Sequence, residues 1–288
     1  MRTRPRKNNH SELGASIGLR PALSQPLQTL NLKWVEVISD DYIGIDRRNW
    51  LDLEKHREKS EIVFHGVGLD IGGTDPLDLN YLASLKSLFA HFEPSWVSDH
   101  ICWTNVLGHP SFDLLPLPYN QECLEHLCGR IHFAQDYCAR TWTFENPSLY
   151  LLPENSDMSE GDFFSELQQK TGCNFLLDLN NIHVSSHNLK LDTQKILKGW
   201  PFHAVVQFHL AGALKDHDYL IDTHNQIVSE PVWKLFREVL KITGPKPCLI
   251  EWDRDFPEFQ VLFNQYSKAQ GILDEFARVP DSILPAAP

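Results

Sequence analysis

The feature that most constrains the fold is an eightfold alternation of a short apolar segment with a longer segment that carries apolar residues at helical spacing. Alternation of this kind predicts strands followed by helices and therefore a parallel sheet. Eight such units within 288 residues predict closure into a single (β/α)8 TIM barrel. An open doubly wound sheet is the alternative, but no glycine-rich phosphate-binding loop follows an early strand. The expected strands are residues 15–20, 34–39, 61–67, 96–101, 141–146, 174–179, 204–210 and 247–252.

The segments between these strands predict the surrounding helices. Residues 76–91, 120–140, 159–171 and 230–243 carry the clearest helical spacing of apolar residues. No linker or low-complexity segment interrupts the alternation, so we expect one barrel domain over residues 14–279. A flexible basic tail at 1–13 and a C-terminal tail at 280–288 would flank it.

Charge and cysteine content narrow the functional classes. The formal net charge is −12, and an acidic surface repels a phosphate backbone, so we expect no nucleic-acid partner. The six cysteines include no C-x-x-C pair, which indicates reduced thiols rather than a disulfide framework. The basic start of the chain is not followed by an apolar segment, and no segment reaches the length of a membrane span. We therefore expect a cytoplasmic protein without membrane association.

Residues that can bind metal ions stand at the carboxyl ends of the predicted strands. TIM-barrel enzymes build their active sites at this end of the barrel. A further pair, Asp222 and His224, lies in the connection after the seventh strand and is spaced to share one face of an extended segment. The strand-end residues are His65, His100, Glu145, Asp178, His209 and Glu251.

Each of these residues has a simpler interpretation when it is taken alone. A histidine after an apolar segment is commonly a core or surface residue, and an acidic residue there commonly caps a helix. Together, however, they would bring four carboxylates into one barrel mouth, where uncompensated anions are costly. Two or three divalent cations would offset that cost. Nitrogen and oxygen ligands without a thiolate suit iron, manganese or zinc, and the sequence does not choose among them.

At these residues the chain resembles a known family over nearly its whole length. It is similar to the multinuclear non-heme iron oxidases that mature ribosomally made peptides, typified by the methanobactin-biosynthesis oxidase, within the xylose-isomerase-like barrels. The motifs that carry the resemblance are His65-Gly66-Val67-Gly68-Leu69, Ser98-Asp99-His100, Glu145-Asn146-Pro147-Ser148, Leu177-Asp178-Leu179-Asn180-Asn181, His209-Leu210-Ala211-Gly212 and Ile221-Asp222-Thr223-His224.

The resemblance implies two to three iron ions as cofactors and molecular oxygen as co-substrate. The substrate would be a cysteine of a ribosomally synthesised precursor peptide, presented with the help of a small partner protein. Catalytic roles would fall to Glu145, Asp178, His209 and Glu251. The residues Asn146, Asn180, His183 and His187 would support the ligands or contact substrate. The implied metal ligands are His65, His100, Glu145, Asp178, Asn181, His209, Asp222, His224 and Glu251.

Departures from the family pattern limit what is carried over. Asn181 stands where the related zinc endonuclease has histidine, which favours the oxidase branch. Asp99 replaces the usual glutamate, and Leu189 and Ala213 stand where histidine is common. These differences leave the implied ligands in place but advise against transferring a particular modification chemistry. The alternatives are a divalent-metal sugar isomerase or epimerase, a zinc endonuclease-like hydrolase, and a non-catalytic binding module on the same barrel.

Overall fold

The computed structural model describes residues 12–44 and 48–278. The predicted C-terminal tail and nearly all of the predicted N-terminal tail lie outside these residues. The predicted limits of the barrel domain therefore stay predictions.

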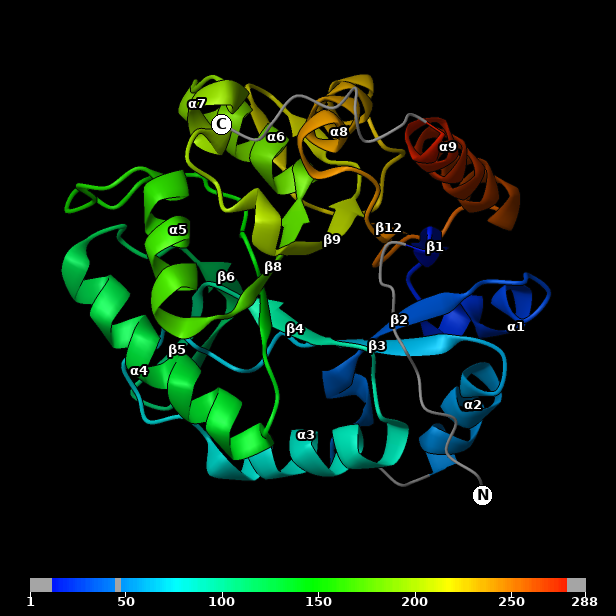
Figure 1. The fold of residues 1–288 in the computed structure, drawn as a ribbon, viewed down its shortest axis with the longest axis horizontal. Helices are drawn as coiled ribbons and strands as arrows, with labels where there is room; N and C mark the ends of the chain where they lie inside the picture. The colour runs from blue at the N-terminus through cyan, green and yellow to red at the C-terminus, as the bar shows by residue number, and fades with distance from the viewer. Residues whose placement is uncertain (1–11, 45–47, 279–288) are drawn as a thin grey trace.

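The described residues contain a sheet of eight parallel strands that closes into a barrel (Figure 1). Around the barrel the order is β1-β12-β9-β8-β7-β4-β3-β2. A parallel bridge between Leu19 and Val37 joins the two ends of the sheet. Each strand lies within its predicted segment, so the TIM-barrel prediction is confirmed. The strands are β1 (Ala15–Ile17), β2 (Trp34–Ile38), β3 (Glu61–His65), β4 (Val97–His100), β7 (Thr143–Glu145), β8 (Asn174–Asp178), β9 (Val205–Leu210) and β12 (Cys248–Ile250).

Helices surround the barrel, and several begin at a side chain that caps them. Asp78, Asn120 and Ser159 each accept a backbone N–H bond at the start of a helix, which satisfies donors that a helix leaves unpaired. The helices are α1 (Ser24–Leu27), α2 (Arg48–Arg57), α3 (Leu79–Phe92), α4 (Gln121–Cys138), α5 (Glu160–Thr171), α6 (Leu179–Leu189), α7 (Thr193–Leu197), α8 (Glu230–Thr243) and α9 (Phe259–Ala277), with short 3-10 turns η2 (Pro21–Leu23), η3 (Ser39–Tyr42) and η4 (Phe202–Ala204).

The interior of the barrel has an apolar floor. Trp34, Val63, Trp96 and Leu249 form a buried cluster, with the rings of Trp34 and Trp96 5.5 Å apart. Side chains two residues apart on a strand point to the same side, so His65 lies above Val63 and Glu251 lies above Leu249. The floor therefore supports a polar layer toward the carboxyl ends of the strands.

Two β-hairpins in the loops were not predicted. Strands β5 (Trp103–Val106) and β6 (His109–Leu115) follow β4, and strands β10 (Leu214–Asp216) and β11 (Tyr219–Ile221) follow β9. Both hairpins are antiparallel. They follow the strands that carry His100 and His209. Within the described part of the chain, no helix is both long and apolar enough to cross a membrane.

Candidate metal centre

Imidazole and carboxylate groups converge at the carboxyl ends of the barrel strands. Within each of four overlapping groups among the described residues, the potential ligand atoms lie within 4.8 Å of one another. Glu251 belongs to three of these groups and Glu145 to two. The groups are His65, His100 and Glu145; His65, His209 and Glu251; Glu145, Asp178, His209 and Glu251; and His224, Glu251 and Asp253.

The first group lies where β3, β4 and β7 end. Nε2 of His65 is 3.2 Å from Oε2 of Glu145, and Nε2 of His100 is 3.4 Å from the same oxygen. The hydroxyl of Ser98 lies 2.9 Å from Nδ1 of His65. That contact fixes the ring with Nε2 toward the centre, because a histidine ring is oriented by the bond its other nitrogen makes.

His209 occupies the middle of the centre. Its Nδ1 lies 3.0 Å from Oε2 of Glu251, 3.6 Å from Oε2 of Glu145 and 4.0 Å from Oδ2 of Asp178. The side chain is fully buried. One imidazole nitrogen therefore faces carboxylates from β7, β8 and β12.

Asp178 ends β8 and also caps the helix that follows. Its Oδ1 accepts the backbone N–H of Asn181 at 2.6 Å, at the start of α6. Its Oδ2 is buried without a hydrogen bond and faces His209 and His224. The simple helix-cap interpretation and the ligand interpretation are compatible, because each uses a different oxygen.

His224 lies opposite, on the loop after β11. Its Nε2 is 2.7 Å from Oδ1 of Asp222, and its Nδ1 is 3.0 Å from Oε2 of Glu251 and 3.1 Å from Oδ2 of Asp253. His224 has a φ of +45°, a left-handed conformation that is uncommon outside glycine. The loop therefore holds this ring against the centre in a strained backbone geometry, which functional sites often contain.

The fit of this centre to metal ions rests on its orphaned atoms. Buried polar atoms that lack a hydrogen bond cost roughly 1–3 kcal/mol each, and native proteins contain few. Here several converge, and a shared cation would satisfy them together. Their nitrogen and oxygen chemistry fits iron, zinc or manganese. Several of these atoms lie within ion-pair distance of one another but make no well-directed hydrogen bond. They include His100 Nδ1, Glu145 Oε2, Asp178 Oδ2, Asn180 Oδ1, Asn181 Oδ1, His209 Nδ1, His224 Nε2 and Glu251 Oε2.

The charges of the centre are strongly interdependent. Burial, followed by the neighbouring His100 and His209, lowers the pKa of His65 well below its usual value. Burial alone would also lower the pKa of His100, but Glu145 and Asp99 outweigh it and raise that pKa to about 9. Burial and the charge of Glu145 raise the pKa of Asp178 well above its usual value. Without metal, the side chains of His100 and Asp178 therefore favour their protonated forms.

Two further histidines behave in the same way as His100. Burial opposes the charged form of His209, but Glu251 and Glu36 raise its pKa well above the usual value. For His224, Asp222 and Glu251 outweigh burial and raise the pKa likewise. A metal ion would displace these protons, since a ligating nitrogen must be deprotonated.

The sequence-predicted ligands that do not appear in the four groups lie beside them. Asp222 contacts His224, as given above, and Asn181 donates to the backbone oxygen of Asn146 at 3.0 Å while its own Oδ1 has no partner. Asn146 pairs with both backbone groups of Asp178. Asn180 donates to Asp222 Oδ1 at 2.8 Å. A supporting function for Asn146 and Asn180 stays a prediction.

The remaining two predicted residues are placed differently. The ring of His187 is exposed and lies 2.9 Å from the backbone oxygen of Asp218, on the β10–β11 hairpin. His183 is half-buried, and burial lowers its pKa. Neither belongs to a group of converging ligands among the described residues. A function for them in substrate contact stays a prediction.

Sequence reasoning missed three charged residues at the centre. Glu36 on β2 is fully buried, with Oε2 3.1 Å from Nε2 of His209. Arg20 is buried beyond β1 and donates to Oδ1 of Asp253 at 2.7 Å. A signal existed for Glu36, because it is the single charged residue in the apolar segment 34–39. A sequence signal also existed for Asp253, because this acidic residue follows the predicted ligand Glu251 by two positions.

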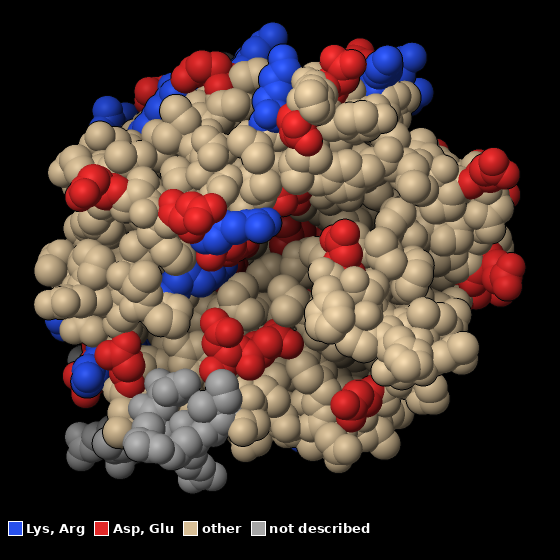
Figure 2. Space-filling view, turned by 180° about the vertical axis from the view of Figure 1, so that it is seen from behind, with Lys and Arg blue, Asp and Glu red and all other residues tan. Residues whose placement is uncertain are grey.

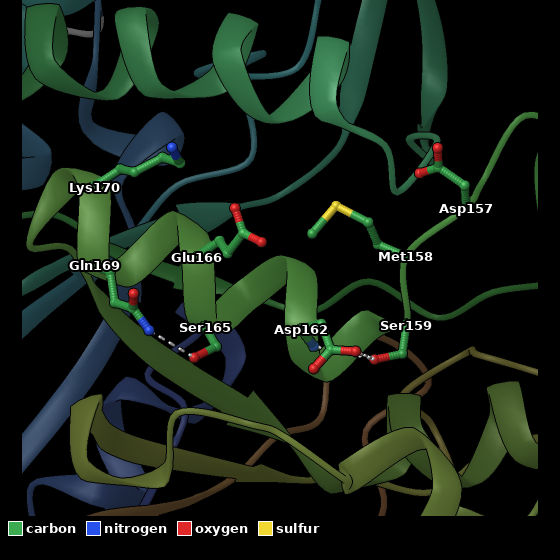
Figure 3. A pocket seen from close by; sticks show the side chains of 8 residues that line it. All are labelled: Asp157, Met158, Ser159, Asp162, Ser165, Glu166, Gln169 and Lys170. Atoms are coloured by element: carbon green, nitrogen blue, oxygen red, sulfur yellow. Dashed lines mark hydrogen bonds between the residues drawn. The ribbon is translucent and has the colours of Figure 1, made fainter.

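A surface hollow lies away from this centre. It has a volume of about 830 Å³ and runs along α5 and the segment before it (Figure 3). Its polar side chains pair locally, Ser159 with Asp162 and Gln169 with Ser165, and they are spread along the helix rather than converging. We therefore assign no chemistry to it. The face shown in Figure 2 is hollowed near its middle, with acidic side chains in and around the hollow.

Comparison with known proteins gives a family match over most of the chain. A sequence model described as "RiPP precursor modification enzyme MbnB/TglH/ChrH" matches residues 14–274; RiPPs are ribosomally synthesised, post-translationally modified peptides. A "UPF0276 protein" of Caulobacter vibrioides (strain NA1000 / CB15N) is 38% identical over 264 residues, covering 89% of this chain and 93% of the relative. A "UPF0276 protein VP3015" of Vibrio parahaemolyticus is 39% identical over 252 residues, covering 86% and 88%.

Solved structures share the fold at low sequence identity. Endonuclease IV from Thermus thermophilus aligns with a TM-score of 0.58 at 13% identity, covering 91% of this chain and 99% of that one. L-ribulose 3-epimerase aligns with a TM-score of 0.56 at 11% identity, covering 93% and 94%. At such identities the likeness shows the xylose-isomerase-like barrel alone, because one barrel supports many chemistries.

Proposed function

The chain belongs to the MbnB/TglH/ChrH family of RiPP precursor modification enzymes, and from this membership we propose that it is a multinuclear non-heme iron oxidase. Its substrate would be a cysteine of a ribosomally synthesised precursor peptide. Molecular oxygen would be the co-substrate, and a small partner protein would help to present the peptide. The observation that carries the proposal is the convergence of the buried, unpaired ligand atoms at the strand ends.

The ligand groups support a chain of two or three ions. His65, His100 and Glu145 would hold one ion, and His209, Asp178 and Glu251 would hold the next, with Glu145 reaching both. Asp222, His224 and Glu251 would hold a third, assisted by Asn181. When bound, iron would supply one-electron redox chemistry and oxygen activation, which no side chain of this centre provides.

The chain's own residues would prepare the reaction. Because the pKa values of His209 and His224 are raised, these rings would hold protons until metal binds. The deprotonated carboxylates would then balance the charge of the ions within a buried site. The hairpins β5–β6 and β10–β11, which flank the mouth, would line the path of an extended peptide that delivers its cysteine thiol.

Metal content is the first test. We expect two to three iron ions per chain, by elemental analysis of protein purified without oxygen from iron-supplemented cells. Glu145→Ala should lose metal, while Glu166→Ala, on the outer face of α5, should retain it. Zinc or manganese at the same stoichiometry, with iron unable to replace it, would instead support isomerase or hydrolase chemistry.

Oxygen consumption tests the reaction itself. With iron-loaded enzyme, the cognate precursor and its partner, we expect oxygen uptake together with a mass change confined to a cysteine-bearing fragment of the peptide. Replacement of that cysteine by serine should abolish both signals. Full metal content and full oxygen consumption in Glu145→Ala would refute the proposal.

A further inference from the structure

A chain of hydrogen bonds beneath the centre fixes the orientation of one of its histidines. It starts in the apolar floor, where the indole Nε1 of Trp96 donates to Oε1 of Gln207 at 2.6 Å. Nε2 of Gln207 donates to Oε2 of Glu36 at 2.6 Å. Nε2 of His209 lies 3.1 Å from the same oxygen. Gln207 and Glu36 are fully buried, and Trp96 is 5% exposed.

The donor and acceptor roles in this series of hydrogen bonds follow from its first residue, Trp96. An indole N–H can only donate, so the oxygen of the Gln207 amide must face Trp96. The amide nitrogen of Gln207 then faces Glu36 and donates to it. Oε2 of Glu36 is therefore an acceptor.

The acceptor Oε2 of Glu36 also determines which nitrogen of His209 carries the proton. Nε2 of His209 can approach Oε2 of Glu36 favourably only as an N–H donor. In a ring that binds a metal ion, the other nitrogen must offer a lone pair. That nitrogen is Nδ1, which lies 3.0 Å from Oε2 of Glu251 and 3.6 Å from Oε2 of Glu145 but makes no well-directed hydrogen bond.

We propose that Trp96, Gln207 and Glu36 are positioning residues that make Nδ1 of His209 the metal-binding atom and keep the proton on Nε2. The inference rests on the metal centre of the proposed function but not on iron, oxygen or peptide. Carboxylates that hold a metal-bound histidine in this way commonly change metal affinity by about 10- to 100-fold.

Zinc-loaded protein gives the direct test, because Zn²⁺ is diamagnetic and binds the same ligand types. In ¹⁵N NMR of histidine-labelled protein, we expect the His209 ring to show a protonated Nε2 and a metal-bound Nδ1. A metal-bound Nε2 would overturn the inference and leave the metal centre itself in place. Failure of the protein to bind zinc at all would overturn both.

Zinc affinity, measured by competition with a chelator, tests the individual residues. Glu36→Met removes the acceptor at similar volume, and we expect at least about a tenfold loss for one zinc ion. Glu36→Gln keeps an oxygen for both donors, so its affinity should stay within a few-fold of the wild type. Wild-type affinity in Glu36→Met would contradict the proposal.

A matched pair of tryptophans separates positioning from packing. Trp96→Phe should free the Gln207 amide to turn over and weaken zinc binding several-fold. Trp34→Phe alters the same floor cluster, but the Nε1 of Trp34 donates to the backbone oxygen of Gly14 instead. It should leave zinc affinity unchanged. Equal losses in both variants would show that the floor acts through packing alone, and this comparison remains decisive if Glu36→Met does not fold.

Discussion

At the scale of single residues, the candidate centre contains side chains that have a structural contact and could also bind a metal ion. Asp178 is the clearest case. Its Oδ1 caps α6, and its Oδ2 is buried without a hydrogen bond beside the other proposed ligands. Asparagine is as good a helix cap as aspartate, whereas alanine is not. Substitutions at this one position can therefore separate the two contributions.

For Asp178→Asn we expect loss of metal with no loss of stability in the metal-free protein. Asp178→Ala should lose metal and also be less stable than Asp178→Asn by about 1 kcal/mol, the usual cost of a lost N-cap. Chemical denaturation of metal-free samples and elemental analysis of loaded samples measure the two effects. Equal stability of the two variants would mean that the cap contributes nothing.

Proton release should accompany metal binding. The raised pKa values of His100 (about 9), His209 and His224 mean that these rings are protonated at pH 7 without metal. Metal affinity should therefore increase as pH increases from 6 to 8, because fewer protons must be displaced. Calorimetry in buffers of different ionisation enthalpy measures the release. An affinity that falls over this interval would contradict the expectation.

The same shifts give the metal-free protein the opposite trend. A histidine whose pKa is raised by folding contributes stability that is full below its unfolded pKa and is lost as pH rises through the folded value. The contribution of His100 should thus decline between about 6.5 and 9. Denaturation of metal-free protein at a series of pH values measures this decline, with His100→Gln as the comparison that should lack it.

The sequence predicted those residues of the candidate centre that stand at the ends of strands. Residues such as His65 and Glu251 follow apolar segments directly, and barrel geometry brings such ends together. The charge of Glu36 within an apolar segment is visible in the sequence, but the residue stands inside a strand, two positions after Trp34, rather than at a strand end. Glu36 contacts Gln207 and His209, which lie on a strand that is distant in the sequence. No local sequence pattern predicts these contacts.

At the scale of elements, Glu160 links three parts of the outer layer. It begins α5, accepts the indole N–H of Trp200 at 3.1 Å, and lies 3.5 Å from the hydroxyl of Tyr119. Burial raises the pKa of this carboxyl to about 7, although both donors oppose that shift. A carboxyl with a raised pKa binds its proton more tightly in the folded state.

Stability should consequently fall as pH rises from about 4.5 to about 7 through this group. The expected loss is about 2 kcal/mol, less than the full shift implies because the side chain is only half-buried. Glu160→Gln should flatten that part of the profile while keeping both hydrogen bonds. A wild-type slope in the variant, measured by denaturation across this range, would assign the loss to other groups.

Buried strands could be predicted from the sequence more readily than the strands of the hairpins. The barrel strands read as short apolar segments because both of their faces are covered. No residue in the two strands of the β5–β6 hairpin is buried, and Leu107 in the turn and Phe112 in β6 have positive φ. Such strands lack the apolar pattern, so only the structure reveals them.

At the scale of the whole molecule, bound metal should couple the strands together. The proposed ligands come from β3, β4, β7, β8, β9 and the segment after β12, so an ion should bind the folded barrel far better than the unfolded chain. At a free metal concentration 1,000 times the dissociation constant, the gain is about 4 kcal/mol per ion. For a domain of this size we expect an increase in Tm of about 10 °C.

Calorimetry with and without a chelator measures this increase. Glu145→Gln keeps the size of the side chain but removes a charge shared by two ligand groups, and it should abolish most of the increase. A Tm independent of the chelator would indicate that the centre holds no ion. The family and the barrel were predictable at this scale, because strand-end motifs spread over the whole chain carry both.

The seam of the barrel has a consequence for biosynthesis. β1 pairs with β12, and Arg20 beside the first strand reaches Asp253 beyond the last. A ribosome delivers Glu251 only after every other barrel strand has been translated. Until then the emerging chain holds an incomplete set of ligands and an open sheet edge on either side of the gap. Metal acquisition should therefore be a late event in maturation, following closure of the seam rather than guiding the earlier strands into place.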